Sequence, residues 1–394
     1  MTQTTRNCPA CASSASAETI LQRRNVPVLQ NVIVPSESEA RAFPTHDLHY
    51  VMCPSCGFVW NQAFDDSKID YSGNYNNSVQ SSAFYLQHQR AMARNVLASL
   101  PADRTGYVEV GCGAGEFIEN LLDVADGKIG AVTGFDPAWT GQRDFDERVT
   151  IHAKYFSLDD LGLLPRGIGA IASRHTIEHI PSPRAFVEIL ADACRAEKVD
   201  LFPETPDVAW ILENTAFEDW FYEHCSLFSP ASIDGLLADF GMTAKTEAVY
   251  AGQYMWTHAT AGDAQRSTDG VQRLLDLAGR YRRESSALLE RWREDLSARR
   301  RAGPVAVWGA ASKGVTFSLL MNRDEPLVDF GVDLNPAKQG CYMPVTGTPI
   351  VSPEDARAAG VATLIVMNPN YHGEITGQVA AMGWDAEVLN LRPG

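Results

Sequence analysis

The pattern of apolar and polar positions is clearest from residue 106 onward. Residues 106–122, GYVEVGCGAGEFIENLL, predict an apolar strand, a glycine-containing turn and the start of an amphipathic helix. AVTGFDP, residues 131–137, predicts a second strand, and residues 151–161 and 169–183 continue the alternation of strand and turn. Strands that alternate with helices in this way are typical of a parallel, doubly wound sheet.

The last third of the chain repeats this plan after one long helix. Residues 270–302 carry apolar positions at helical spacing among many charges, which predicts a solvated connecting helix. Residues 303–321, GPVAVWGAASKGVTFSLLM, again predict a strand, a glycine turn and a helix. A strand that ends at Asp333 and a buried strand within 362–375 follow, so we expect a second Rossmann-like unit. Its turn, GAASKG, lacks a third glycine, which disfavours redox binding of NAD.

Composition and charge narrow the class of protein. The 394 residues are 45% hydrophobic and 21% charged, which suits two or three globular domains. A net charge of -16 disfavours binding to nucleic acid, which needs clustered Lys and Arg. The first residues lack the apolar core of a secretory signal, and no segment approaches the roughly 18 apolar residues of a membrane helix. We therefore expect a soluble, cytoplasmic protein without a nucleic-acid or membrane partner.

Two cysteine pairs predict a metal site near the N-terminus. Cys8 and Cys11 form CPAC, and Cys53 and Cys56 form CPSCG. In a reducing compartment such pairs favour metal binding over disulfides, with a redox pair as the alternative. Four thiolates suit tetrahedral Zn²⁺ and leave no open position for a substrate, so the predicted zinc is structural.

A second motif, HTIEH at residues 175–179, formally matches the H-x-x-E-H pair of inverted zinc metalloproteases. That chemistry needs a long helix that presents both histidines on one face. Here an apolar strand precedes His175, and Pro181 and Pro183 follow almost at once, so the context disfavours a protease.

The segment EVGCGAG followed by a strand that ends in an acid resembles class I S-adenosylmethionine (SAM)-dependent methyltransferases. The glycines allow backbone amides to approach a ligand, and the acid can bind ribose hydroxyls. The resemblance implies a SAM site and places His175 and Glu178 at its border. The residues assigned to the cofactor are Glu109, Gly111, Gly113, Gly115, Asp136, Phe156, Asp160 and His175, with Phe156 and Asp160 near the adenine.

The order of all these parts resembles the three-domain C-methyltransferases that methylate nucleotide-linked keto sugars in antibiotic biosynthesis. The shared landmarks are the two CxxC pairs, EVGCGAGEF, RHTIEHIPSP, FYEHCSLFSP, WGAASKGVTF and VDLNPAKQG. The expected fold is α/β, with a zinc-binding N-terminal module, a central class I methyltransferase doubly wound sheet and a C-terminal Rossmann-like domain. The expected boundaries are 1–70 for the zinc-binding domain, 71–260 for the methyltransferase domain, 261–302 for the connecting helix and 303–394 for the Rossmann-like domain.

The stretch FEDWFYEHCSLFSP, residues 217–230, carries the candidate catalytic residues. In the family the Glu-His pair, here Glu223 and His224, lies beside the methyl donor, and the histidine is implicated as the base. A neutral imidazole can remove a proton alpha to a carbonyl and so make the carbon nucleophilic. Tyr222 or Tyr75 is expected to stabilise the resulting enolate oxygen. Structural packing of an aromatic segment is the alternative interpretation.

These observations predict a SAM-dependent C-methyltransferase that acts on a small polar substrate, with a nucleotide-linked keto sugar as one candidate. The alternatives are N- or O-methylation of a small metabolite, or a SAM-binding scaffold without turnover. We expect SAM and a structural Zn²⁺ as cofactors and favour a monomer. The segments YSGNYNNSVQ and MNPNY depart from the sugar enzymes, and both would face the substrate in the family fold.

Overall fold

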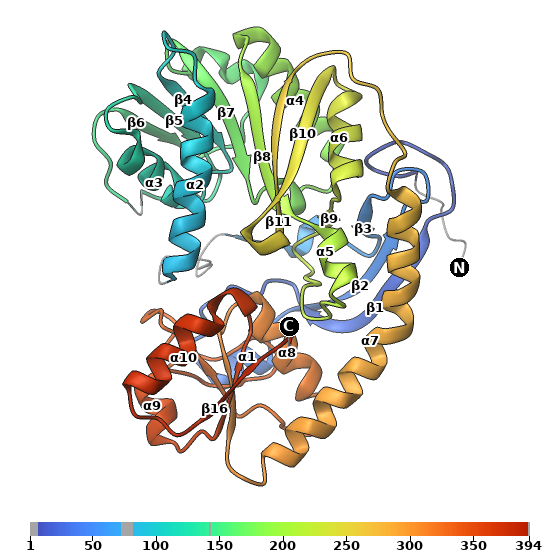
Figure 1. Ribbon diagram of the computed structural model, residues 1–394, viewed down its shortest axis with the longest axis vertical. Helices are drawn as coiled ribbons and strands as arrows, with labels where there is room; N and C mark the ends of the chain where they lie inside the picture. Colours follow the sequence, from blue (N-terminus) through green and yellow to red (C-terminus); the bar gives the residue numbers. More distant parts are fainter. Residues whose placement is uncertain (1–6, 72–81, 142, 393–394) are drawn as a thin grey trace.

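The computed structural model describes residues 7–71, 82–141 and 143–392, arranged around three β-sheets (Figure 1). A four-stranded sheet lies in the N-terminal part, a seven-stranded sheet in the centre and a five-stranded sheet in the C-terminal part. The mixed α/β fold predicted from the sequence is therefore confirmed. Among the described residues, no helix is long and apolar enough to cross a membrane.

The N-terminal sheet is antiparallel and has the strand order β1-β2-β3-β9. Its last strand comes from much later in the chain, because β9 pairs Ser226 with Trp60 and Leu227 with Val59. The short helix α1 (Glu37–Arg41) lies between the first two strands in sequence. The strands are β1 (Glu18–Pro27), β2 (Thr45–Met52), β3 (Val59–Asn61) and β9 (Ser226–Leu227).

The central sheet has the order β10-β11-β8-β7-β4-β5-β6. Five strands are parallel, and four of them, β4, β5, β7 and β8, bury almost every side chain, which explains their apolar sequence, whereas the edge strand β6 is partly exposed. The strand β11 runs antiparallel to both of its neighbours. The strands are β4 (Gly106–Val110), β5 (Ala131–Phe135), β6 (Val149–His152), β7 (Ile168–Arg174), β8 (Asp200–Pro206), β10 (Met242–Val249) and β11 (Tyr254–Ala261).

Helices cover both faces of this central sheet (Figure 1). Capping side chains mark several of their starts: Ser82 accepts from the amide of Tyr85, and Ser229 accepts from that of Ser232. The helices on its faces are α2 (Ala83–Ser99), α3 (Glu116–Ala125), α4 (Pro183–Glu197) and α6 (Pro230–Ala238), whereas α5 (Val208–Glu213) packs with α7 (Val271–Arg299) and the N-terminal strands.

The C-terminal unit contains the parallel sheet β14-β13-β12-β15-β16, as the second strand-turn-helix pattern predicted. Its helices are α8 (Ser312–Met321), α9 (Pro353–Ala358) and α10 (His372–Ala381). Its strands are β12 (Val305–Trp308), β13 (Phe330–Val332), β14 (Ile350–Val351), β15 (Thr363–Val366) and β16 (Glu387–Asn390).

The long helix α7 (Val271–Arg299) runs along one side of the molecule and links the outer two sheets (Figure 1). Leu274, Leu277 and Tyr281 pack with apolar residues of the N-terminal strands, whereas Leu296 joins the core of the C-terminal unit. The helix is therefore more than a solvated connector, because one stripe of its surface completes two separate cores.

Candidate active site

The four N-terminal cysteines converge on one point. The Sγ atoms of Cys8 and Cys56 lie 3.7 Å apart, as do those of Cys11 and Cys53, and all four lie within 4.8 Å of one another. No disulfide joins them. Zn–S bonds of about 2.3 Å in a tetrahedron place sulfur atoms roughly 3.8 Å apart, so the cluster has the size that Zn²⁺ requires.

Tight turns and a shared core position these thiols. The amide of Ala12 donates to the carbonyl of Cys8, and the amide of Gly57 donates to that of Cys53, both at 2.9 Å. The cysteines belong to the same apolar cluster as Ile171 and Leu201 of the central sheet. A structural metal here would therefore stabilise the contact between the N-terminal sheet and the central sheet as well as the turns themselves.

The cofactor turn follows β4. Gly111, Gly113 and Gly115 all have left-handed backbone angles, with φ of 77°, 53° and 77°. A Cβ on Gly111 would lie 2.1 Å from Oγ1 of Thr176, whereas one on Gly113 would meet nothing within 4 Å. Gly113 therefore borders open space, as a residue beside a ligand should.

Two acids face this turn. Asp136 follows β5, and its Oδ2 accepts the amide of Gly113 at 2.8 Å while Oδ1 accepts that of Ala138 at 2.8 Å. Glu109 is buried, and its Oε2 has no hydrogen-bond partner among the described residues. Burial, opposed by the charge of Arg174, raises the pKa of Glu109 to about 8, so this carboxyl can donate a hydrogen bond at neutral pH. The turn, the orphaned oxygen and Asp136 fit a polar cofactor such as SAM.

The remaining residues assigned to the cofactor have different surroundings. Phe156 is buried, with its ring centroid 4.9 Å from that of Phe135. Asp160 has both carboxylate oxygens engaged, since Oδ1 lies 2.5 Å from Nζ of Lys154 and Oδ2 accepts from the amide and hydroxyl of Ser157. Contact between Asp160 and an adenine would have to compete with these bonds.

The segment 217–230 is held by the N-terminal part of the chain. The hydroxyl of Tyr50 lies 2.6 Å from the carbonyl oxygens of both Phe221 and His224. The amide of Gln30 donates to Oε1 of the buried Glu223 at 3.0 Å. The hydroxyl of Tyr222 accepts from the amide of Asp65 at 2.8 Å and donates to its carbonyl at 3.2 Å. A role for Tyr222 beside an enolate would require this pair of bonds to break.

The HTIEH motif lies directly against His224. Within this motif the structure has only one short 3-10 helix, η3 (Ile177–His179). The long helix of a metalloprotease is therefore absent from this described segment. The rings of His179 and His224 are 4.8 Å apart, and Nδ1 of His175 lies 3.4 Å from Oε1 of Glu178. Burial and the nearby charge of His179, opposed by Glu178, lower the pKa of His224 to about 3, which keeps the imidazole neutral.

Tyr75 lies outside the described residues. Tyr71, four positions earlier, places its hydroxyl 2.8 Å from Nδ1 of His179. The sequence pattern did not single out Tyr71 or His179. The sequence offered one signal for each residue. Tyr71 lies just after the zinc-binding region, and His179 lies inside the family motif RHTIEHIPSP.

The carboxyl ends of the central and C-terminal sheets meet at a polar junction. Gln253 follows β10, and its Nε2 donates to Oδ1 of Asn368 at 3.0 Å, just beyond β15. Nζ of Lys313, in the second glycine turn, lies 2.8 Å from Oδ2 of Asp219 and 2.9 Å from Oε1 of Gln253. The hydroxyls of Tyr250 and Tyr371 also bond across this junction. Ligands of open α/β sheets bind at such strand ends, so two ligand-binding edges face each other here.

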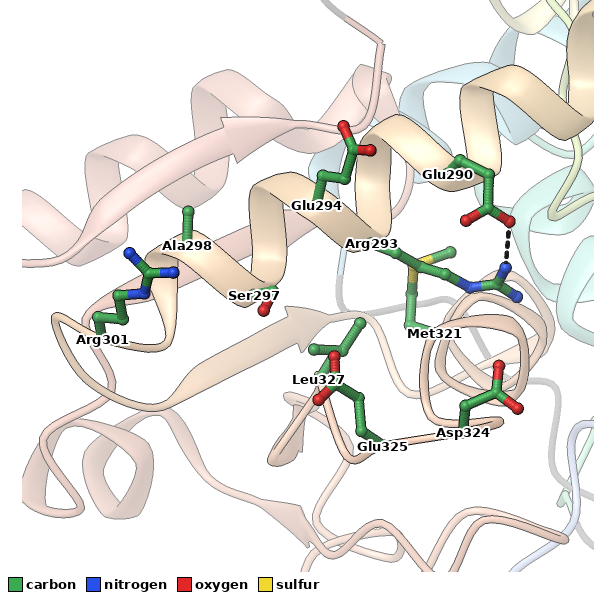
Figure 2. Close-up of a pocket in the computed structure, with 10 residues that line it drawn as sticks. All are labelled: Glu290, Arg293, Glu294, Ser297, Ala298, Arg301, Met321, Asp324, Glu325 and Leu327. Atoms are coloured by element: carbon green, nitrogen blue, oxygen red, sulfur yellow. Dashed lines mark hydrogen bonds and ion pairs between the residues drawn. The ribbon is translucent and has the colours of Figure 1, made fainter.

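A separate pocket lies between α7 and the segment 321–327 (Figure 2). Charged side chains of α7 and the segment 321–327 line it, and Glu290 pairs there with Arg293. None of the predicted site residues contributes to this pocket. Its mixed charge gives it no relation to the cofactor turn.

Two family models match this chain, one over each of the two units that contain a glycine turn. Residues 85–247 match the methyltransferase domain family, and residues 261–389 match the C-methyltransferase C-terminal domain family. A comparison with curated proteins found no match.

Several solved structures are similar to part of this chain, at low sequence identity and low TM-score. The methyltransferase domain of bacterial CtHen1 is 15% identical, with a TM-score of 0.35 over 44% of this chain and 98% of its own. An S-adenosylmethionine-dependent methyltransferase from Listeria monocytogenes is 12% identical, with a TM-score of 0.32 over 43% and 99%. DhpI, solved with SAH, is 16% identical, with a TM-score of 0.30 over 46% and 97%.

The fold, the glycine turn with Asp136 and the match over residues 85–247 define the protein as a SAM-dependent methyltransferase. More particularly, it is a methyltransferase that carries the C-terminal domain of the C-methyltransferases.

We predict one zinc per chain, held by Cys8, Cys11, Cys53 and Cys56, with a role in folding. Metal analysis of protein purified without chelator should give one equivalent, and Cys53→Ser should lose it and unfold at lower temperature. Cys341→Ser, at a thiol outside the cluster, is the matched control. Metal-free parent protein, or a disulfide within either pair, contradicts the assignment.

We predict that Gly113→Val abolishes SAM binding, because the side chain would enter the open space beside the turn and strain a residue with φ of 53°. Asp136→Ala should weaken binding less. Calorimetry measures both affinities. Gly360→Val is the control, since Gly360 also has a positive φ and open surroundings but lies in the C-terminal unit. Equal affinity in the Gly113 variant and the parent removes the cofactor from this turn.

We predict that Tyr222→Phe lowers the free energy of unfolding by about 1–3 kcal/mol, because the amide and carbonyl of Asp65 lose their partner. Urea unfolding measures the change, and Tyr155→Phe, at a residue that is 76% exposed, should be neutral. A variant of parental stability that has lost methylation would instead indicate that Tyr222 acts on the substrate.

Proposed function

We propose that this enzyme is a C-methyltransferase that removes a proton from a carbon alpha to a carbonyl of a small polar substrate and transfers a methyl group to that carbon. The observation that carries the proposal is the neutral imidazole of His224, whose ring lies 4.8 Å from that of His179 in η3. A carbon acid needs a base before it can be methylated, whereas many oxygen and nitrogen nucleophiles do not.

SAM, when bound, supplies an electrophilic methyl group, and its sulfur keeps the electron pair of the C–S bond as the new C–C bond forms. The chain's own residues handle the proton. His224 takes the proton from the substrate carbon onto a ring nitrogen, and the electron pair of the broken C–H bond is delocalised onto the carbonyl oxygen. Glu223, fixed by the amide of Gln30, is placed to orient the substrate or the imidazole.

The substrate is proposed to bind at the junction of the two sheets. Gln253, Asn368, Tyr250 and Tyr371 offer amide and hydroxyl groups there, which suits a hydroxyl-rich compound. The second Rossmann-like edge and the resemblance to the sugar enzymes support a nucleotide-linked keto sugar as the substrate class. Methylation of O or N in a small metabolite is the competing proposal.

The reaction type can be tested with SAM that carries a ¹³C-labelled methyl group. The enzyme is incubated with a panel of nucleotide-linked keto sugars, their reduced alcohols and the free sugars. The ¹³C chemical shift of the product separates C–CH₃ from O–CH₃ and N–CH₃. Label on carbon with the ketones alone supports the proposal, and label on oxygen or nitrogen overturns it.

We predict that His224→Asn lowers the methylation rate by roughly 10²- to 10⁴-fold, the usual contribution of a general base, while SAM affinity barely changes. Exchange of the substrate's alpha hydrogen for deuterium, measured with S-adenosylhomocysteine in place of SAM, isolates proton removal. His258→Asn is the control, because His258 bonds to Asp200 on the sheet away from the cluster. Parental exchange in the His224 variant would place the base elsewhere.

A further inference from the structure

The carboxylate of Glu178 lies among three imidazoles, those of His175, His179 and the candidate base His224. Glu178 is buried, and donor atoms of Glu178, His179 and His224 lie within 4.8 Å of one another. His175 approaches Oε1 of Glu178 from the end of β7, and the hydroxyl of Thr205 on β8 donates to Oε2 at 3.1 Å. The cluster is assembled from β7, η3, β8 and the segment before β9.

The anionic form of Glu178 is the favoured one. Burial alone would raise the pKa of this carboxyl, but the hydrogen bond with His175 and the neighbouring histidines lower it to about 2. Glu178 therefore carries a negative charge at neutral pH.

Among the charged groups around His224, Glu178 is the one placed to act as the negative charge beside this imidazole. Glu204 on β8 is another buried acid and lies 3.9 Å from Nε2 of His175, but it is engaged by Arg174 and by His88 of α2. From the remaining elements, Tyr71 faces His179, and Glu223 and Cys225 belong to the same segment as His224. Among the described acids, Glu178 is the one whose ligand-type atom clusters with His224.

A base in this position needs a counter-charge. When His224 accepts a proton, the new imidazolium lies in surroundings that penalise a positive charge and beside a second histidine. A fixed anion within a few ångströms offsets that penalty and makes the imidazole a stronger base.

We propose that Glu178 is the positioning residue that makes His224 an effective base. This inference rests on the proposed function. It assigns a purpose to the HTIEH motif, whose acid and second histidine are brought to the reaction site by the turn after β7.

The same atoms could instead take a divalent cation. Both oxygens of Glu178 already have protein partners, His175 and Thr205, and Nδ1 of His179 faces Tyr71. This hydrogen bonding favours proton handling, and metal analysis decides between the two in the experiment below.

The test is the pH profile of Glu178→Gln. Because an anion raises the pKa of a neighbouring imidazole, its removal should lower the pKa of His224. We expect kcat to fall 10- to 100-fold and KM to change little, while the acid limb of kcat/KM moves to lower pH. Glu178→Asp should recover part of the rate, and Glu188→Gln, at an exposed position on α4, should match the parent.

The outcomes separate this inference from the proposed function. A slower variant whose acid limb stays in place indicates a merely structural role and overturns the inference. Two metal equivalents in the parent and one in Glu178→Gln also overturn it, in favour of a second metal site. Parental rates and profile in Glu178→Gln, with methyl on carbon in the parent, overturn the inference alone. Methyl on oxygen or nitrogen in the parent overturns the proposed function first.

¹⁵N-labelled histidine gives a readout that needs no substrate. Nδ1 of His175 faces the carboxylate of Glu178, so this ring should carry its proton on Nδ1 in the parent. The ¹⁵N shifts should show a different tautomer in Glu178→Gln, with His175→Asn used for assignment. An unchanged tautomer contradicts the geometry on which the inference depends.

Discussion

The structure depends on one constraint: the segment before α6, within residues 217–230, must pack against the N-terminal sheet and the central sheet at the same time. In sequence it follows α5 of the methyltransferase region, but its strand β9 completes the N-terminal sheet. The side chains of Trp220, Tyr222 and Leu227 are fully buried, and Tyr50 bonds to backbone oxygens on both sides of Tyr222 and Glu223. Exposing this segment would cost both apolar burial and hydrogen bonds, so His224 is held at the contact between two folding units.

Through this arrangement, a structural metal at the cysteine cluster would act on the segment that carries His224 from a distance. The cysteine cluster fixes the turn that joins β2 to β3, and β3 is the strand on which β9 pairs. Loss of such a metal would therefore loosen the sheet that anchors residues 217–230, without any contact between the metal and a substrate.

A buried charged group supports the cofactor side of the site. Arg174 pairs with Glu204 at 2.6 Å and lies over the ring of Phe117, and His88 bonds to the other oxygen of Glu204 at 2.5 Å. Buried pairs of this kind add little net stability, but removing one partner leaves an uncompensated charge and costs about 3–5 kcal/mol. The group ties α2, β7 and β8 together, and the charge of Arg174 also acts on Glu109 of β4, the strand that leads into the glycine turn.

The sequence by itself determined the elements whose signals are local. The glycine turns, the strand that ends at Asp136, the long helix and the two cysteine pairs follow from periodicity and from spacings of a few residues. The sequence context already disfavoured a protease role for HTIEH, but only the tertiary structure brought its Glu178 and His179 to His224, more than 40 positions away. It also committed the hydroxyl of Tyr222 to Asp65, and Glu223 to Gln30, through contacts between residues more than 150 positions apart. No local pattern encodes such contacts, because they arise from the packing of whole sheets rather than from the periodicity of one segment.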